Sequence, residues 1–223
     1  MRFYLRLTFL CLILPFQLLA QSNGEQDSAY TKTITLRADK IVAPLGMADS
    51  MVTIKVRDII VSQYRALNEI HTAKDEKLKS AKIVKATNKD LADELSRNAT
   101  NEAAAALYNL HFDYLSKLLR YLDEEKVEMV KDGMTYGVLP ITYMGYCDMI
   151  RDLTEAQKRQ IKVWLVEARE HAMDAGSSDE KHQWFGKYKG RINNYLSAAG
   201  YDLKKEGEEW QTRIKASKNQ ANQ

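Results

Sequence analysis

Several features that identify common classes of protein are absent from this 223-residue chain. It has only two cysteines and three prolines, and it contains neither an HExxH zinc motif nor a Gly-rich phosphate-binding loop. Sequence motifs for a Ser or Cys nucleophile are also absent. No apolar run reaches the ~20 residues that a membrane-spanning helix needs. The scarcity of cysteine means that a hydrophobic core has to stabilise the fold, and a chain of this length can bury one.

The first twenty residues have the three parts of a secretory signal peptide. Arg2 and Arg6 precede and flank the apolar run Leu7–Leu19, and Ala20 supplies a small residue at the cleavage position. Cleavage there removes 2 of the 33 basic residues, which leaves 31 against 30 acidic ones, and makes Cys147 the only cysteine. We therefore expect an exported protein, periplasmic or extracellular, that is not an integral membrane protein. Its near-neutral charge gives no electrostatic reason to bind nucleic acid.

The remainder, residues 21–223, is patterned as helices. A helix is expected from about Thr31 to Ala43, and Asp49 should cap a second, strongly periodic one. The charged stretch Lys74–Glu94 predicts an exposed helix or helical hairpin, and a further helix should begin near Asn98. The pattern predicts an all-α protein with one compact domain of about seven helices, in which residues 21–30 and 216–223 are disordered.

Two later helix starts share one design. Asp123 and Thr154 each follow a leucine and precede acidic residues and an apolar helix. A capping oxygen satisfies free N–H groups, and acidic side chains favour the positive end of a helix. Thr154 and Gln157 also have the spacing of a capping box.

Residues 133–146 interrupt the helical pattern with glycines and a proline. Gly133, Gly137, Pro140 and Gly145 break regular helices, and tyrosines alternate with them. We expect a loop here. It is either a recognition loop, because loops held by a scaffold often carry function, or a buried crossover whose tyrosines bond to the backbone.

The segment Gly176–Leu203 departs furthest from ordinary amphipathic patterning. Ser177 and Glu180 have capping-box spacing, and Gly200 should end the helix that they begin. Within that helix, Gly186 and Gly190 each cost about 1 kcal/mol relative to alanine. Either a neighbouring helix approaches closely at these glycines, which is our first interpretation, or a ligand needs the space.

Similarity to a known family is carried by RADKIV and VRDIIVSQYRALNEIH in the first half of the chain and by KDGMTYGVLPITY, LVEAREHAMDAGSS and KHQWFGKYKGRINNYLSAAGYDLKKEGEEW in the second. These stretches resemble a secreted, all-helical family of the Bacteroidetes that is a domain of unknown function and is described as sugar-binding. The resemblance covers roughly Ala38 to Trp210. It implies export and a role beside polysaccharide use, and it carries over no catalytic residue.

The residue types near the unusual helix fit a carbohydrate ligand. Aromatic rings stack on the C–H faces of sugars, polar side chains bond the hydroxyls, and Lys187, Lys189 or Arg191 could pair with the carboxylate of an acidic sugar. The candidate ligand-binding residues are Tyr136, Tyr143, Trp184, Lys187, Tyr188, Arg191 and Asn194. The expected partner is a neutral or acidic glycan, with no cofactor, metal or catalytic residue assigned. An aromatic stripe is also typical of a helix core, so the exposure of Trp184 and Tyr188 discriminates between the two readings.

Two alternatives remain beside the carbohydrate hypothesis. The protein could be a periplasmic structural or adaptor protein without small-molecule chemistry, built from its long charged helices. A glycan-active enzyme is ranked last. His171, Asp174 and His182 could hold a metal with a water, but no pair of carboxylates stands out for glycoside cleavage. His111, which lies on an apolar stripe, is interpreted as a core histidine.

Overall fold

The computed structural model describes residues 16–221, and this part of the chain consists of helices joined by short turns, with no strand. The elements in order are α1 (Phe16–Val42), a short 3-10 helix (Ala43–Leu45), α2 (Ser50–Val84), α3 (Lys89–Leu118), α4 (Glu124–Met134), α5 (Val138–Met149), α6 (Glu155–Met173), α7 (Ser178–Ala198) and α8 (Leu203–Ala221). The all-α prediction is confirmed. Within residues 16–221, no helix is both long and apolar enough to cross a membrane.

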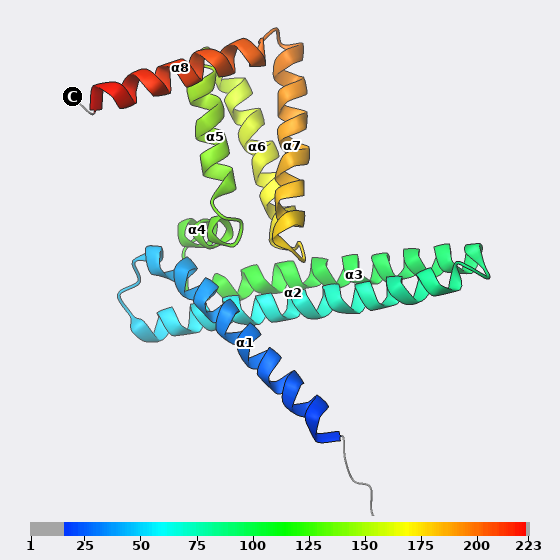
Figure 1. Cartoon of the computed structure of the whole chain (residues 1–223). Coiled ribbons are helices and arrows are strands. Elements are labelled where there is room, and N and C mark those ends of the chain that lie inside the picture. The colour runs from blue at the N-terminus through cyan, green and yellow to red at the C-terminus, as the bar shows by residue number, and fades with distance from the viewer. Residues whose placement is uncertain (1–15, 222–223) are drawn as a thin grey trace, which may run out of the picture.

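Two groups of helices make up the fold. Helices α2 and α3 form a long antiparallel hairpin that α1 crosses, and α5, α6 and α7 stand side by side next to it, with α8 across their far end (Figure 1). One hydrophobic cluster is built from α1–α4 and a second from α5–α7 with the start of α8. Met173, at the end of α6, belongs to the first cluster, so α6 joins the two groups.

Local capping chemistry begins four of these helices as expected. The Asp49 carboxylate accepts from Met51 N at 2.7 Å, and the Asp123 carboxylate accepts from Lys126 N at 2.8 Å. Thr154 and Gln157 form the predicted reciprocal capping box. Ser177 Oγ accepts from Glu180 N at 3.1 Å, but the Glu180 carboxylate bonds Gly176 N rather than Ser177 N. The box at α7 is therefore displaced by one residue.

Three predicted helix boundaries differ from the structure. The first helix already includes residues 21–30, where Arg65 of α2 pairs with Asp27 at 3.1 Å and Tyr30 Oη donates to the Tyr64 carbonyl oxygen at 3.1 Å. Helix α3 begins at Lys89 because Asn88 caps it, and α8 continues through residues 216–221. Residues 1–15 of the predicted signal peptide, and residues 222–223, lie outside the described residues.

The predicted loop at residues 133–146 is wrong, because only Thr135–Gly137 separate α4 from α5. Pro140 lies in the first turn of α5, where a missing N–H leaves no helical bond unmade. Tyr136 and Gly137 make the turn with φ of 60° and 64°. A Cβ on Gly133 would lie 3.0 Å from the Ile41 side chain, so this glycine allows α1 to approach α4.

A cluster of charges around the buried Arg169 joins the two groups of helices. Arg169 of α6 is 2% exposed and donates to the Asp132 carboxylate of α4 at 2.8 Å and to the Glu128 carboxylate of α4. Lys131 of α4 pairs with Glu128 at 2.9 Å and with Glu170 of α6 at 3.3 Å. A guanidinium can be buried only when its N–H groups are paired in this way. We call Glu128, Lys131, Asp132, Arg169 and Glu170 the α4–α6 charge cluster.

Candidate functional site

The turn between α6 and α7, residues 174–177, is fixed by side chains from three helices. The Asp174 carbonyl oxygen accepts from His71 Nε2 of α2 at 2.8 Å, and the Asp174 carboxylate lies 2.9 Å from His111 Nδ1 of α3. Lys181 Nζ of α7 donates to the Ala172 carbonyl oxygen at 2.9 Å. A Cβ on Gly176 would lie 2.7 Å from the His71 ring, so glycine is needed for the turn to pack on α2.

His111 connects this turn to the α4–α6 charge cluster. Its Nε2 lies 3.4 Å from the Glu170 carboxylate, and hydrogen bonds to Asp174 and Glu170 outweigh burial and raise the pKa of His111 to about 9. Burial favours a higher pKa for Glu170, but the His111 bond and the charges of Lys131 and Arg169 hold it at about 2. At neutral pH His111 is therefore a partly buried cation between two carboxylates, which gives it a structural role.

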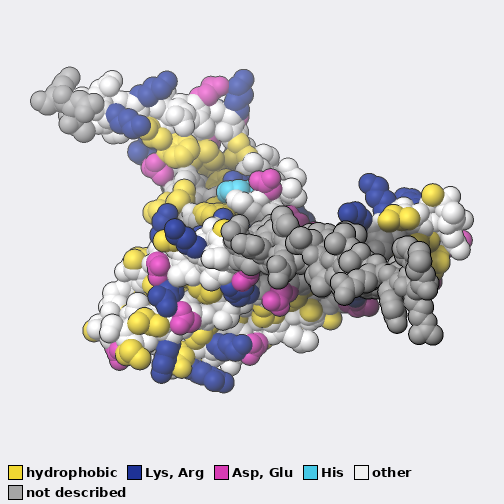
Figure 2. Space-filling model, turned by 60° about the horizontal axis from the view of Figure 1, so that its bottom comes forward, with side chains coloured by type: hydrophobic (Ala, Val, Ile, Leu, Met, Phe, Trp, Pro, Cys, Tyr) yellow, Lys and Arg dark blue, Asp and Glu magenta, His cyan; other side chains and the backbone are white. Residues whose placement is uncertain are grey.

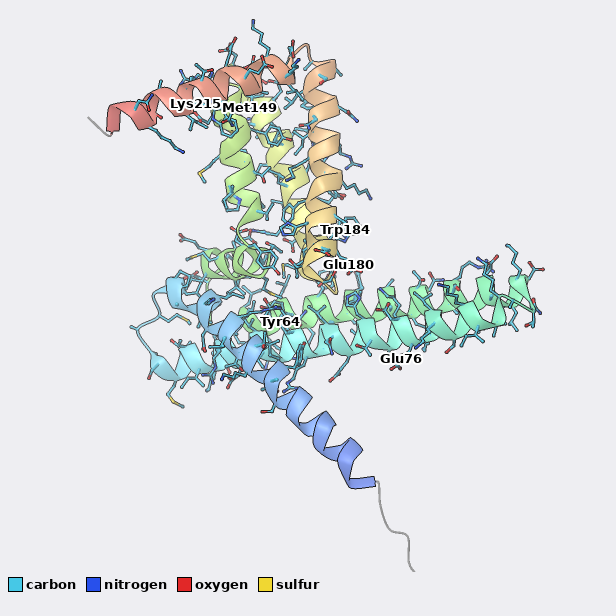
Figure 3. All side chains as sticks on the ribbon, in the orientation of Figure 1. Tyr64, Glu76, Met149, Glu180, Trp184 and Lys215 are labelled. Atoms are coloured by element: carbon cyan, nitrogen blue, oxygen red, sulfur yellow. The ribbon has the colours of Figure 1, made fainter. Side chains whose placement is uncertain are left out.

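A pocket of about 400 Å³ lies between α2 and α7 beside the turn. Figure 3 shows Trp184 and Glu180 at the base of α7, next to the α2–α3 hairpin. The pocket, which we call the Trp184 pocket, is lined by His71, Lys74, Ala175, Glu180, Gln183, Trp184 and Lys187. The Trp184 ring is half-buried and stacks on His171 at 4.3 Å between centroids, and Lys187 Nζ lies 4.9 Å from its centre. Trp184 and Lys187 are two of the seven predicted site residues.

Tyr188 and Arg191 lie further along α7, outside this pocket. Tyr188 is only 4% exposed, beneath the Arg191 guanidinium, which lies 5.3 Å from the Tyr188 ring and 5.7 Å from the Trp164 ring. Arg191 is exposed and reaches the Glu167 carboxylate at 3.6 Å. Tyr188 is therefore a core residue that supports Arg191. The two aromatic residues differ in exposure, because Trp184 borders a pocket and Tyr188 does not.

The other three predicted residues are spread over different faces. Tyr136 is 49% exposed, stacks on His182 at 5.7 Å, and lines a separate cavity of about 260 Å³. Tyr143 packs against the second hydrophobic cluster from α5, and Asn194 is exposed on α7. The structure thus brings two of the seven residues into one pocket and does not assemble all seven.

Gly186 and Gly190 face open space. Both are exposed, and a Cβ added at either one would meet no atom within 4 Å among the described residues. The interpretation that a neighbouring helix approaches these glycines is therefore wrong. They leave the outer surface of α7 bare on the turns that carry Lys187 and Arg191, so the second interpretation, space for a ligand, stays a prediction.

Two lining residues of the Trp184 pocket were missed by the sequence analysis. His71 and Lys74 come from α2, more than 100 residues before Trp184 in the chain. They are three apart on one helix and therefore share a face. That spacing could have marked them as a pair, but nothing in the sequence says which helix they face.

The metal hypothesis finds no support in the geometry. His171 stacks on Trp184, His182 stacks on Tyr136, and Asp174 bonds His111 and His71, so these three residues do not converge. Across residues 16–221, no group of three or more His, Cys, Asp or Glu side chains is arranged to hold a metal ion.

Comparison with known proteins places the chain in a family. Residues 31–216 match the family model described as "Protein of unknown function (DUF3826)". The chain belongs to this family. The expected membership of an uncharacterised family is thereby confirmed, and the match spans the whole of α2–α7. A search of curated proteins found no match to the chain.

The raised pKa of His111 predicts a pH-dependent stability. Because the folded-state pKa of about 9 lies above the ordinary 6.5, the stabilisation is complete below about pH 6.5 and is lost as the pH rises towards 9. Urea unfolding should show that His111→Gln lowers the free energy of unfolding at pH 6 by roughly 2 kcal/mol more than at pH 8. The control is His182→Gln, which replaces an exposed histidine. Equal pH dependence in His111→Gln and the unmodified protein would contradict the assigned role.

Proposed function

We propose that this protein is an exported carbohydrate-binding accessory protein for polysaccharide use, and that a glycan binds in the Trp184 pocket. The observation that carries this proposal is the composition of the pocket: a half-buried indole beside hydrogen-bonding groups in a concave space of about 400 Å³. Pockets for small ligands are usually ~300–1,000 Å³, with an apolar surface and a few polar groups that fix orientation. The family resemblance to proteins described as sugar-binding points the same way.

Each side of the pocket supplies a different part of sugar recognition. Trp184 offers an aromatic surface for the C–H face of a ring, once the Lys187 side chain above it moves aside. Gln183 and Glu180 can bond hydroxyl groups, and they lie on the same helix as Trp184. Fixed polar groups of this kind give orientation and specificity, while the ring gives contact area.

The charges of the lining favour acidic over neutral glycans. Among the described lining residues, Lys74 and Lys187 are opposed by one carboxylate, that of Glu180, which is itself bonded to Gly176 N. Lys74 is also only loosely paired with Asp75, at 3.7 Å. A uronate-containing chain could therefore exchange water for a charge-assisted hydrogen bond to either ammonium group.

The direct test is affinity gel electrophoresis against a panel of neutral and acidic plant and host polysaccharides. The unmodified protein should be retarded by at least one of them, and Trp184→Ala should weaken that binding at least tenfold, because the ring contact is lost. A tenfold loss corresponds to about 1.4 kcal/mol of binding free energy.

Tyr108→Ala is the matched control, since Tyr108 is an exposed aromatic on α3 outside the pocket. It should bind like the unmodified protein. The proposal fails if no polysaccharide retards the protein, or if Trp184→Ala and Tyr108→Ala are retarded equally.

Export forms the second part of the proposal and rests on the charged start, the apolar run and Ala20. In a Gram-negative host, the full chain should appear in the periplasm or medium with Gln21 as its first residue, as mass spectrometry of the intact protein would show. A chain that stays in the cytoplasm with residues 1–20 attached would contradict export without affecting the glycan proposal.

One observation favours the adaptor alternative. The end of the α2–α3 hairpin projects away from the other helices (Figure 1), and apolar and basic side chains lie together on it (Figure 2). Ile83 is 73% exposed there, and Leu91 and Leu95 are exposed as well. An exposed apolar group of this kind is typical of a surface that contacts another protein. The adaptor function is the better supported of the two if no polysaccharide in the panel retards the protein.

A further inference from the structure

The cavity that contains Tyr136 has a chemistry different from that of the Trp184 pocket. It lies between α1, α2 and the start of α7, on the other side of Ala175, and has a volume of about 260 Å³. Its lining is Tyr30, Ile34, Arg37, Tyr64, Leu67, Asn68, Tyr136, Ala175, Gly176, Ser177, Ser178 and Lys181. We call it the tyrosine cavity. Figure 3 shows Tyr64 where α1 crosses α2, below the base of α7.

Among the described residues, two cations and no carboxylate line the tyrosine cavity. Lys181 is 6% exposed, and Arg37 is an exposed residue of α1 at the cavity wall. Among the residues whose side chains are described, 27–219, Arg37 has no ion pair. Like charges held near each other in a partly buried space repel, and an anion between them would relieve that repulsion.

Lys181 has hydrogen-bonding capacity left for a ligand. Its Nζ donates to the Ala172 carbonyl oxygen at 2.9 Å and, more weakly, to the Met173 carbonyl oxygen at 3.4 Å. An ammonium group has three N–H donors, so one remains for a group in the cavity. Burial lowers the pKa of Lys181 to about 8, and the charge of Arg37 acts in the same direction while those of Asp174 and Glu180 oppose it. A bound anion would favour the charged form.

The remaining walls suit a hydroxylated ring. Tyr30, Tyr64 and Tyr136 all line the cavity, and Tyr30 Oη donates to the Tyr64 carbonyl oxygen at 3.1 Å. Burial raises the pKa of Tyr64 to about 12, so its hydroxyl stays protonated and able to donate. Asn68 and the hydroxyls of Ser177 and Ser178 add further donors and acceptors.

Size limits the ligand to one ring. A volume of about 260 Å³ is below the ~300 Å³ at which pockets for drug-sized ligands begin. We propose that the tyrosine cavity binds a single uronic acid residue, with its carboxylate between Arg37 and Lys181 and its ring among Tyr30, Tyr64 and Tyr136. This site is separate from the Trp184 pocket and does not depend on the function proposed for it.

Isothermal titration of the purified protein with glucuronate tests the proposal. Glucuronate should bind saturably and at least tenfold more tightly than glucose, which has the same ring without the carboxylate. Inorganic phosphate should compete poorly, because it has no ring for the tyrosines. Equal binding of glucuronate and glucose, or phosphate binding as tight as that of glucuronate, would overturn the uronic acid assignment.

Two variants test whether glucuronate binds in the tyrosine cavity. Arg37→Met removes a cation from a surface position of α1 and should weaken glucuronate binding at least tenfold, whereas Lys40→Met, an exposed cation of α1 outside the cavity, should not. Tyr136→Gly should weaken it without loss of fold, because glycine readily adopts the φ of 60° found there. Circular dichroism confirms that each variant is folded.

The Trp184→Ala variant distinguishes uronate binding in the tyrosine cavity from glycan binding in the Trp184 pocket. It changes the other pocket and should leave glucuronate binding unaltered, whether or not polysaccharide binding is lost. Loss of glucuronate binding in Trp184→Ala with full binding in Arg37→Met would place the uronate in the Trp184 pocket and overturn the proposal. The absence of saturable glucuronate binding would overturn it as well.

Discussion

The buried guanidinium of Arg169 is the constraint on which the rest of the structure depends. Its partners Glu128 and Asp132 lie on α4, in the first group of helices, while Arg169 lies on α6, in the second. Removing one partner of a buried pair leaves an uncompensated charge, which is far more costly than losing a surface pair. Through Glu170 and His111 the same network extends to the turn after α6, and the two candidate pockets lie on either side of that turn.

Features that depend on neighbouring residues were predictable from the sequence. The caps at Asp49, Asp123 and Thr154 rest on contacts within one turn, and the 3.6-residue pattern identified the long helices and the all-α class. Trp184 and Lys187 were both candidates because of their residue types, and they share a pocket because residues three apart on one helix share a face. The same local rules failed at residues 133–146, since a proline in the first turn of a helix and a glycine packed on another helix look like loop residues in a sequence.

Features that depend on the arrangement of helices were not predictable. Nothing local shows that Tyr188 is buried in the second hydrophobic cluster, or that Gly186 faces open space rather than a neighbouring helix. The tyrosine cavity combines α1, α2 and α7, so Arg37 and Lys181 are far apart in the chain and could not be paired without the fold. Sequence analysis thus located the helix that carries the Trp184 pocket but not the opposite wall of either pocket.

We infer that the α4–α6 charge cluster makes the two groups of helices one cooperative unit. All three tryptophans, at positions 164, 184 and 210, lie on α6–α8, so their fluorescence reports on the second group and on the pocket where Trp184 meets α2, while far-UV circular dichroism reports on every helix. The most direct measurement follows urea unfolding by both signals. We expect one transition with coincident midpoints. Cooperative coupling would be contradicted if the fluorescence midpoint differed from the circular dichroism midpoint, or if the ellipticity were lost in two steps.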